Sequence, residues 1–329
     1  MLISWNLTRK CNLYCDHCYR DSGPEADCSG ELDTAAGKKL LSEIKSAGFR
    51  LVIFSGGEPL LRDDLCELAA HAAQLGLRPA LGTNGILISA EVAAALRDAG
   101  IAGVAVSLDS RDSAYHDRFR NAPGAWEAAV RGIRNALAAG LRVQINTTLT
   151  GNNFEQFSAL TDFAAELGVQ ALHPFFLVPT GRGRNLAEDA LKSGQYFRMI
   201  ETILEKQKES AIELKPTCAP QFIPMAKEMG LAMRFTRGCL AGVAYCCILP
   251  DGEVHVCPYL PVTAGNVTEQ PFDVIWRDSG TFQALRDYQA YQGRCGQCPD
   301  IGSCGGCRAR AYYYSGGDYL AEEPWCFRG

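Results

Sequence analysis

The 329-residue chain has no apolar run that could cross a membrane, since a span needs roughly 18–20 consecutive apolar residues. It also has no long run of lysine and arginine, and its net charge is −5. These absences argue against nucleic acid or an anionic membrane as the main partner. Residues 1–7 are too few for the apolar part of a signal peptide. We therefore expect a cytoplasmic protein with no membrane span.

Cysteine, by contrast, is abundant, with 15 copies. A reducing cytoplasm makes disulfides unusual, and a chain of this length can bury a core large enough to fold without them. Metal ligation is therefore the better interpretation of the cysteines. Ten of the 15 lie after Pro216, and three lie close together near the N-terminus.

The N-terminal group consists of Cys11, Cys15 and Cys18, spaced as Cys-x-x-x-Cys-x-x-Cys. A [4Fe–4S] cluster is normally held by four thiolates. Three thiolates leave one iron free to bind a small molecule, as the open position of a catalytic metal centre does.

Short apolar runs alternate with longer amphipathic stretches over residues 1–180. We expect strands at 2–7, 51–54, 79–82, 103–108, 142–148 and 170–178, and helices at 34–47, 60–75, 90–99, 124–139 and 154–167. A glycine follows each helical stretch, as is usual at a helix end: Gly48, Gly76, Gly100, Gly140 and Gly168. This βα alternation predicts a parallel sheet, which is either doubly wound or closed into a barrel.

The repeat stops near residue 185, and the second half of the chain has a different character. We expect one long helix over 193–210 and a β-hairpin formed by 244–249 and 253–256 around a Pro-Asp-Gly turn. The sequence therefore predicts a first domain over 1–185, a helical linker over 186–215 and a metal-organised domain over 216–329.

The N-terminal cysteine motif follows the first expected strand, and Ser-Gly-Gly-Glu-Pro at 55–59 ends the second. Together these motifs resemble those of the radical S-adenosylmethionine (SAM) superfamily. In that family the free iron chelates the amino and carboxylate groups of SAM, and cleavage of a C–S bond releases a 5′-deoxyadenosyl radical. The resemblance implies an α/β fold, a partial (β/α)6 TIM-like barrel.

The resemblance also implies a set of SAM contacts at the strand ends. Glycines let the backbone approach a ligand closely, and the Glu58 carboxylate can accept hydrogen bonds from an ammonium group. Strand-end capping and turn formation are the alternative roles for such residues, and His17 has the alternative of a solvated loop. The implied SAM-binding residues are His17, Gly56, Gly57, Glu58, Thr83, Ser107, Asp109, Asn146 and Val178.

The C-terminal cysteines resemble the SPASM extension, which carries two auxiliary [4Fe–4S] clusters. That pattern assigns Cys239, Cys257 and Cys307 to the first, and it assigns Cys295, Cys298, Cys304 and Cys326 to the second. One departure is that two residues, not three, separate Cys304 from Cys307. The first cluster needs a fourth ligand, which is Cys218, Cys246 or Cys247, or else it has an open iron. Paired Cys-x-x-Cys units also form zinc sites.

Segments such as 178–183, 215–220 and 304–311 resemble the subgroup of anaerobic haem and haem d1 biosynthesis. The resemblance implies oxidative decarboxylation of propionates of iron-coproporphyrin III to vinyls, with three [4Fe–4S] clusters and SAM as cofactors. The alternatives are a didecarboxysirohaem deacetylase, a haem d1 precursor synthase, a peptide-modifying maturase, or a non-enzymatic zinc or iron–sulfur module.

A tetrapyrrole substrate bears carboxylates, so its pocket needs cations. Arg182 and Arg184 follow the sixth expected strand and suit bidentate carboxylate contacts, with a solvated loop as the alternative. His173 could ligate haem iron or lie satisfied in the core. We expect ferredoxin or flavodoxin as the electron donor, and a monomer.

Overall fold

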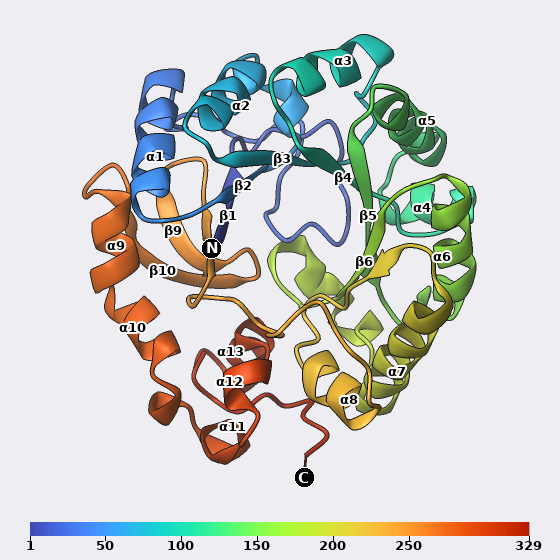
Figure 1. Ribbon diagram of the computed structural model, residues 1–329, viewed down its shortest axis with the longest axis vertical. Coiled ribbons are helices and arrows are strands. Elements are labelled where there is room, and N and C mark those ends of the chain that lie inside the picture. Colours follow the sequence, from blue (N-terminus) through green and yellow to red (C-terminus); the bar gives the residue numbers. More distant parts are fainter. Residues whose placement is uncertain (329) are drawn as a thin grey trace.

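The computed structural model describes residues 1–328, and its centre is one curved ten-stranded sheet. The first six strands are parallel, and each expected strand is confirmed to within two residues at either end. They are β1 (Leu2–Asn6), β2 (Leu51–Ser55), β3 (Arg78–Thr83), β4 (Gly103–Ser107), β5 (Arg142–Leu149) and β6 (Ala171–Phe176). Figure 1 shows these strands curving around the middle of the molecule.

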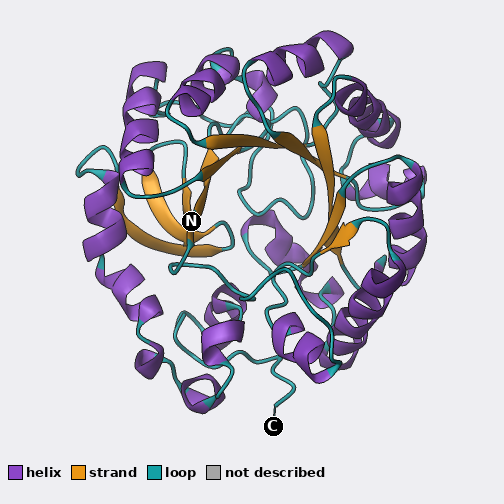
Figure 2. Cartoon of the chain, viewed as in Figure 1, coloured by secondary structure: helices purple, strands orange, loops and turns teal. Residues whose placement is uncertain are grey.

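Helices cover the outside of this sheet (Figure 2). They are α1 (Thr34–Ser46), α2 (Leu65–Gln74), α3 (Ala90–Asp98), α4 (Ser113–Phe119), α5 (Ala125–Ala138), α6 (Phe157–Glu166) and α7 (Ser193–Glu209). The connecting segments contain short 3-10 turns, which are η1 (Pro59–Leu61), η2 (Phe154–Gln156) and η3 (Gly181–Asp189). The sequence did not predict α4, because its seven residues are too few to show a helical period. The expected helix-ending glycines all have positive φ, which confirms their role.

The order of the strands decides between the two folds that the sequence left open. β1 to β6 lie side by side in chain order, with no reversal. A doubly wound sheet reverses its order at the middle, whereas consecutive right-handed crossovers on one side curl the sheet into a barrel. The fold is therefore a partial (β/α)6 barrel, as the resemblance implied.

The C-terminal half continues the same sheet at both edges. β7 (Glu213–Leu214) pairs with β6, and β8 (Tyr245–Ile248) pairs in parallel with β1. β9 (Glu253–Cys257) and β10 (Leu260–Asn266) follow in antiparallel order. The predicted hairpin is confirmed as β8 and β9, but its first strand extends the barrel instead of starting a separate sheet.

The remaining helices are short. They are α8 (Phe222–Glu228), α9 (Phe272–Asp278), α10 (Gly280–Arg286), η4 (Tyr288–Ala290), α11 (Gly293–Gln297), α12 (Ile301–Cys304) and α13 (Arg308–Ser315). In Figure 1, α9 and α10 lie beside β10 on the left, and the others lie below the barrel opening. One apolar core runs through both halves. For example, the Phe49 ring contacts Phe272 and Trp276, with centroids 5.4 and 5.0 Å apart.

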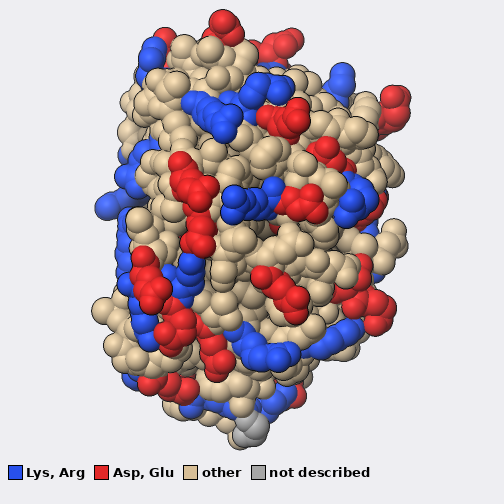
Figure 3. All heavy atoms as spheres, turned by 90° about the vertical axis from the view of Figure 1, so that its right-hand side faces the viewer, with Lys and Arg blue, Asp and Glu red and all other residues tan. Residues whose placement is uncertain are grey.

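The surface shows no large region of one charge on the face drawn in Figure 3, where basic and acidic side chains are interspersed. Across the described residues, no helix is both long and apolar enough to span a bilayer.

Candidate functional site

A cavity of about 660 Å³ lies inside the barrel and gathers cysteines from both halves of the chain. Cys11, Cys15 and Cys18 line it on the loop after β1. The C-terminal half contributes four more thiols to the same wall: Cys218, Cys239, Cys257 and Cys307. The fold thus brings the N-terminal motif and the residues expected at the first auxiliary cluster to one space.

Arg182 holds the loop that carries the N-terminal cysteines. Its Nε donates to the Cys15 carbonyl (2.9 Å) and its Nη2 to the Ser22 carbonyl (2.7 Å). The guanidinium also pairs with Asp21 (2.8 Å) and stacks 3.7 Å from the centroid of the Tyr14 ring. Although Arg182 borders the cavity, these contacts occupy the guanidinium that was expected to bind substrate.

The two glycines of the Gly-Gly-Glu-Pro motif let two loops touch. The Gly57 N–H donates to the Thr8 carbonyl (2.7 Å), and the Glu58 N–H donates to the Lys10 carbonyl (2.8 Å). Gly56 has φ +142°, and a Cβ there would lie 2.6 Å from the Thr8 carbonyl oxygen. Both glycines line the cavity, so their backbone is open to a ligand.

Glu58 does not line this space, and its side chain is fully buried. Its carboxylate accepts from the Thr83 hydroxyl (2.8 Å), the Asn84 N–H (2.9 Å) and the Leu60 N–H (3.1 Å). Burial raises the pKa of Glu58 to about 7, although these hydrogen bonds oppose the rise. The carboxylate expected to bind the SAM amino group therefore ties the motif to the end of β3, and its contact with SAM stays a prediction.

Four other predicted SAM contacts do line the cavity: His17, Thr83, Ser107 and Asn146. Ser107 and Asn146 face each other in register on β4 and β5. The His17 ring stacks on Phe119 with a centroid distance of 4.0 Å and an interplanar angle of 6°. Burial lowers the pKa of His17 to about 4, so the ring is neutral near pH 7.

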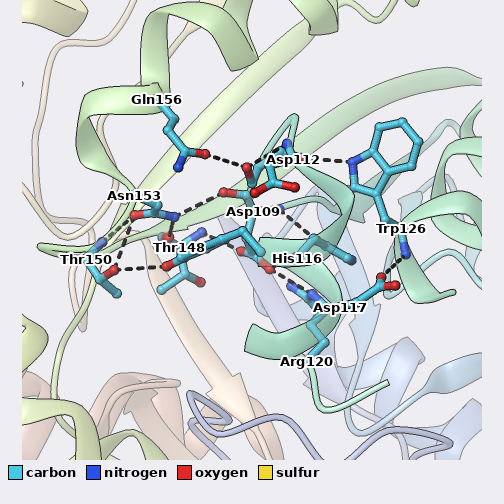
Figure 4. A network of polar contacts seen from close by, with 12 residues as sticks. Asp109, Asp112, His116, Asp117, Arg120, Trp126, Thr148, Thr150, Asn153 and Gln156 are labelled. Atoms are coloured by element: carbon cyan, nitrogen blue, oxygen red, sulfur yellow. Dashed lines mark hydrogen bonds and ion pairs between the residues drawn. The ribbon is translucent and has the colours of Figure 1, made fainter. Parts of the chain in front are cut away.

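Asp109 belongs to a buried network beside the cavity, not to its lining (Figure 4). Its carboxylate accepts from Arg120 Nε (2.8 Å) and from the Thr148 N–H (2.9 Å). Burial alone would raise the pKa of Asp109, but Arg120, His17, His116 and the Thr148 hydrogen bond hold it at about 2. Asp109 is therefore a charged anchor for Arg120.

Sequence reasoning missed Arg120, whose side chain is buried yet lines the cavity. It lies at the end of the short helix α4, and its charge interacts with Cys15 and Cys11. The eleven-residue separation of Arg120 from Asp109 matches no known motif, and their contact forms only because the end of α4 packs against the end of β4. Two other expected residues, Val178 and Arg184, do not line the cavity. Val178 is buried in the core and Arg184 is exposed.

The structure separates the three candidates for the fourth ligand of the first auxiliary cluster. Cys218 has a left-handed backbone (φ +61°), and its thiol contacts Cys307, which lowers the pKa of Cys307 to about 7. Cys246 and Cys247 lie on β8, fully buried and outside the cavity lining. The Cys247 thiol instead accepts from the Arg20 guanidinium (3.4 Å).

A second cavity of about 210 Å³ collects the cysteines expected at the second auxiliary cluster: Cys295, Cys298, Cys304 and Cys326. Arg308 Nη2 and the Glu323 N–H both donate to the Cys295 thiol, at 3.4 and 3.3 Å. Arg310 pairs with Glu323 at 2.7 Å, and both are buried. Hydrogen bonds to ligand sulfurs are one way in which a protein tunes an iron–sulfur cluster.

The number of thiols at each cavity suits iron–sulfur clusters. A [4Fe–4S] cluster is normally held by four thiolates. Three N-terminal and four C-terminal thiols line the first cavity, and four thiols line the second.

Comparison with known proteins agrees with this geometry. The Radical SAM superfamily pattern matches residues 5–164, and the SPASM iron–sulfur cluster-binding domain matches residues 239–299. The AdoMet-dependent heme synthase of Methanosarcina barkeri is 43% identical over 99% of this chain and 95% of its own length. The Fe-coproporphyrin III synthase of the same organism is 31% identical over 99% of this chain and 87% of its own length.

Among solved structures, Streptococcus suis SuiB bound to its precursor peptide SuiA has a TM-score of 0.77 at 18% identity, covering 99% of this chain and 75% of SuiB. That likeness establishes the fold. The sequence matches show that the chain belongs to the radical SAM superfamily, within the SPASM-containing family of the AdoMet-dependent heme synthases, and is an enzyme that uses SAM and iron–sulfur clusters.

Proposed function

We propose that this enzyme oxidatively decarboxylates propionate side chains of iron-coproporphyrin III to vinyl groups. One observation carries the proposal: the N-terminal cysteine triad and the cysteines of the first auxiliary site line the same cavity. A substrate bound there lies between a source of radicals and an acceptor of electrons. Relatives named for haem synthesis that match almost the whole chain support this choice.

The reaction needs both groups of cysteines that line the cavity, the N-terminal triad and the four thiols of the first auxiliary site. Each propionate loses one hydrogen atom from its β-carbon, then CO₂ and one electron, and a vinyl group remains. Cys11, Cys15 and Cys18 would hold the cluster that binds SAM, and with SAM bound this site would supply the 5′-deoxyadenosyl radical that takes the hydrogen. The remaining electron needs an acceptor, and the site formed by Cys218, Cys239, Cys257 and Cys307 is within the same space.

We propose that the cavity residues found above hold SAM. The backbone of Gly56 and Gly57 would accept from its ammonium group, while Ser107 and Asn146 offer polar contacts at neighbouring strand ends. The neutral, stacked His17 would lie beside the adenine. Arg120, fixed by Asp109, would pair with the SAM carboxylate, since guanidinium groups suit that geometry.

The lining also suits a flat, largely apolar ring. Tyr19, Tyr245 and Tyr259 line one side, with Tyr19 and Tyr259 centroids 5.1 Å apart. The Tyr245 hydroxyl lies 2.8 Å from Ser4 Oγ. Aromatic faces favour stacking on another ring, and a cavity of this volume is in the usual range of roughly 300–1,000 Å³ for small-molecule sites.

The test is a reaction of anaerobically purified, cluster-loaded enzyme with SAM, a reductant and iron-coproporphyrin III. We expect 5′-deoxyadenosine and a porphyrin product that has lost two CO₂ and two H₂ equivalents in mass. Didecarboxysirohaem, offered in parallel, is the matched control. Unchanged iron-coproporphyrin alongside SAM cleavage, or deacetylation of the sirohaem derivative, would overturn the substrate assignment.

We further propose that a ferredoxin or flavodoxin supplies the electron that reduces the SAM-binding cluster. We also propose that the enzyme works as a monomer in the cytoplasm, where a reducing environment keeps its 15 cysteines available as ligands.

A further inference from the structure

The cavity wall formed by β5, β6 and the segment after β7 is polar. Asn146 on β5 lies opposite His173 on β6 in the strand register. Lys215 follows β7, and its N–H donates to the Leu172 carbonyl (3.4 Å). The side chains of all three residues line the cavity.

Lys215 is a partly buried cation without an acidic partner. Its Nζ lies 4.6 Å from the centroid of the Phe235 ring, and within residues 1–328 this Nζ atom forms no hydrogen bond or ion pair. The nearby carboxylate of Glu213 is committed elsewhere, to His173 Nε2 (3.4 Å) and Arg234 (2.8 Å). Burial lowers the pKa of Lys215, because a charge taken from water without a partner costs free energy.

The other cations near the cysteines are occupied by the protein. Arg120 is paired with Asp109 and is assigned above to the SAM carboxylate, and Arg182 is paired with Asp21. Arg308 donates to the carbonyls of the 319–321 segment and to a thiol. Arg78 and Arg142 also border the cavity, but they are exposed at the opposite, amino-terminal ends of their strands. Lys215 is three residues from Cys218, at the wall of the first auxiliary site.

We propose that Lys215 binds a propionate carboxylate of the tetrapyrrole and so holds that edge of the substrate beside the first auxiliary site. This inference rests on the proposed function and adds the residue that recognises the substrate's carboxylate. The Lys215 ammonium has no carboxylate partner among the described residues, and a propionate of the substrate supplies one. The charge-assisted hydrogen bond between them forms in a space that is partly shielded from water.

The experiment measures equilibrium binding of iron-coproporphyrin III to the anaerobic, cluster-loaded enzyme by its visible absorbance. Lys215→Gln should weaken binding about 10- to 100-fold, since a hydrogen bond to a charged group contributes on that scale. Lys215→Arg should restore most of the affinity, and Lys208→Gln, an exposed lysine on α7, should change nothing. Iron content and SAM affinity should stay unchanged in every variant.

The tetramethyl ester of the same porphyrin separates carboxylate recognition from packing. It should bind weakly to the wild type and equally weakly to Lys215→Gln, because the charge then has nothing to pair with. An equal loss for acid and ester would overturn the inference, as would unchanged acid binding by Lys215→Gln, while the proposed function would stand. Failure of the wild type to bind iron-coproporphyrin III would overturn both.

Discussion

The ion pair between Asp109 and Arg120 should be one of the most sensitive points in the barrel. The carboxylate is fully buried and the guanidinium nearly so, with side-chain exposures of 0% and 8%. Asp109→Asn keeps the shape and the acceptor for the Thr148 N–H, but it leaves Arg120 as a buried charge without its carboxylate partner. Breaking one side of a buried pair costs about 3–5 kcal/mol.

Hydrogen exchange of the intact, cluster-loaded enzyme measures the loss of local stability around the Asp109–Arg120 pair. The Thr148 amide on β5 donates to Asp109, so its protection reports local opening of the network in Figure 4. A loss of 3–5 kcal/mol should speed exchange of that peptide roughly 150- to 5,000-fold. Peptides from β9 should exchange as in the wild type, because β9 lies at the far side of the sheet.

A second substitution tests whether the orphaned charge is the cause. Asp109→Asn combined with Arg120→Met removes the unpaired cation and should recover at least half of the lost protection. The exposed pair Lys38–Glu67 is the matched control, and Glu67→Gln should change exchange little, since surface pairs contribute about 0–1 kcal/mol. Exchange of the Thr148 peptide accelerated less than tenfold by Asp109→Asn would refute the reasoning.

Three further results are expected. Cys218→Ala should lower the iron content by roughly one cluster, about 4 Fe per chain, whereas Cys246→Ala should leave it unchanged; the reverse pattern would show that β8 supplies the ligand. Arg308→Gln should lower the midpoint potential of the second auxiliary cluster, followed by electron paramagnetic resonance, because it removes a positive charge and the guanidinium hydrogen bond to a ligand sulfur; an unchanged potential would contradict this. Gly132→Ala should destabilise the protein by about 1–3 kcal/mol because its Cβ would collide with the carbonyl oxygen of Gly85, while Gly194→Ala, with open space around it, should be neutral or mildly stabilising in thermal denaturation.

Local patterns were enough to predict most of the barrel. The alternation of apolar runs and amphipathic stretches predicted β1 to β6 and five helices, because the strand period and the helix period of apolar residues can both be recognised within one short stretch of sequence. Short elements were missed: α4 and the C-terminal helices have too few turns to show a period, and β7 has two residues. The parallel pairing of β8 with β1 was also missed, since it joins residues more than 240 positions apart.

In the site, too, features set by local spacing were predictable, and features set by contacts between distant residues were not. Spacing within a few residues was sufficient to single out Cys11, Cys15 and Cys18, because one loop must present all three to one cluster. The roles of isolated charged residues were not predictable. Glu58 and Asp109 were expected at SAM, and the partners that each finds within the protein on burial could not be predicted from spacing. Arg182 looked available for substrate, yet it holds the cysteine loop.

By itself, then, the sequence determined the chemistry: an open cluster, a glycine motif beside it and further cysteines for electron transfer, all encoded by local spacing. The tertiary structure alone decided which side chains face the shared cavity. It brought Cys218 against Cys307, placed Arg120 near the triad and left Lys215 without an acidic partner among the described residues. Those outcomes depend on strand order and on the burial of charge, which arise only when distant segments pack together.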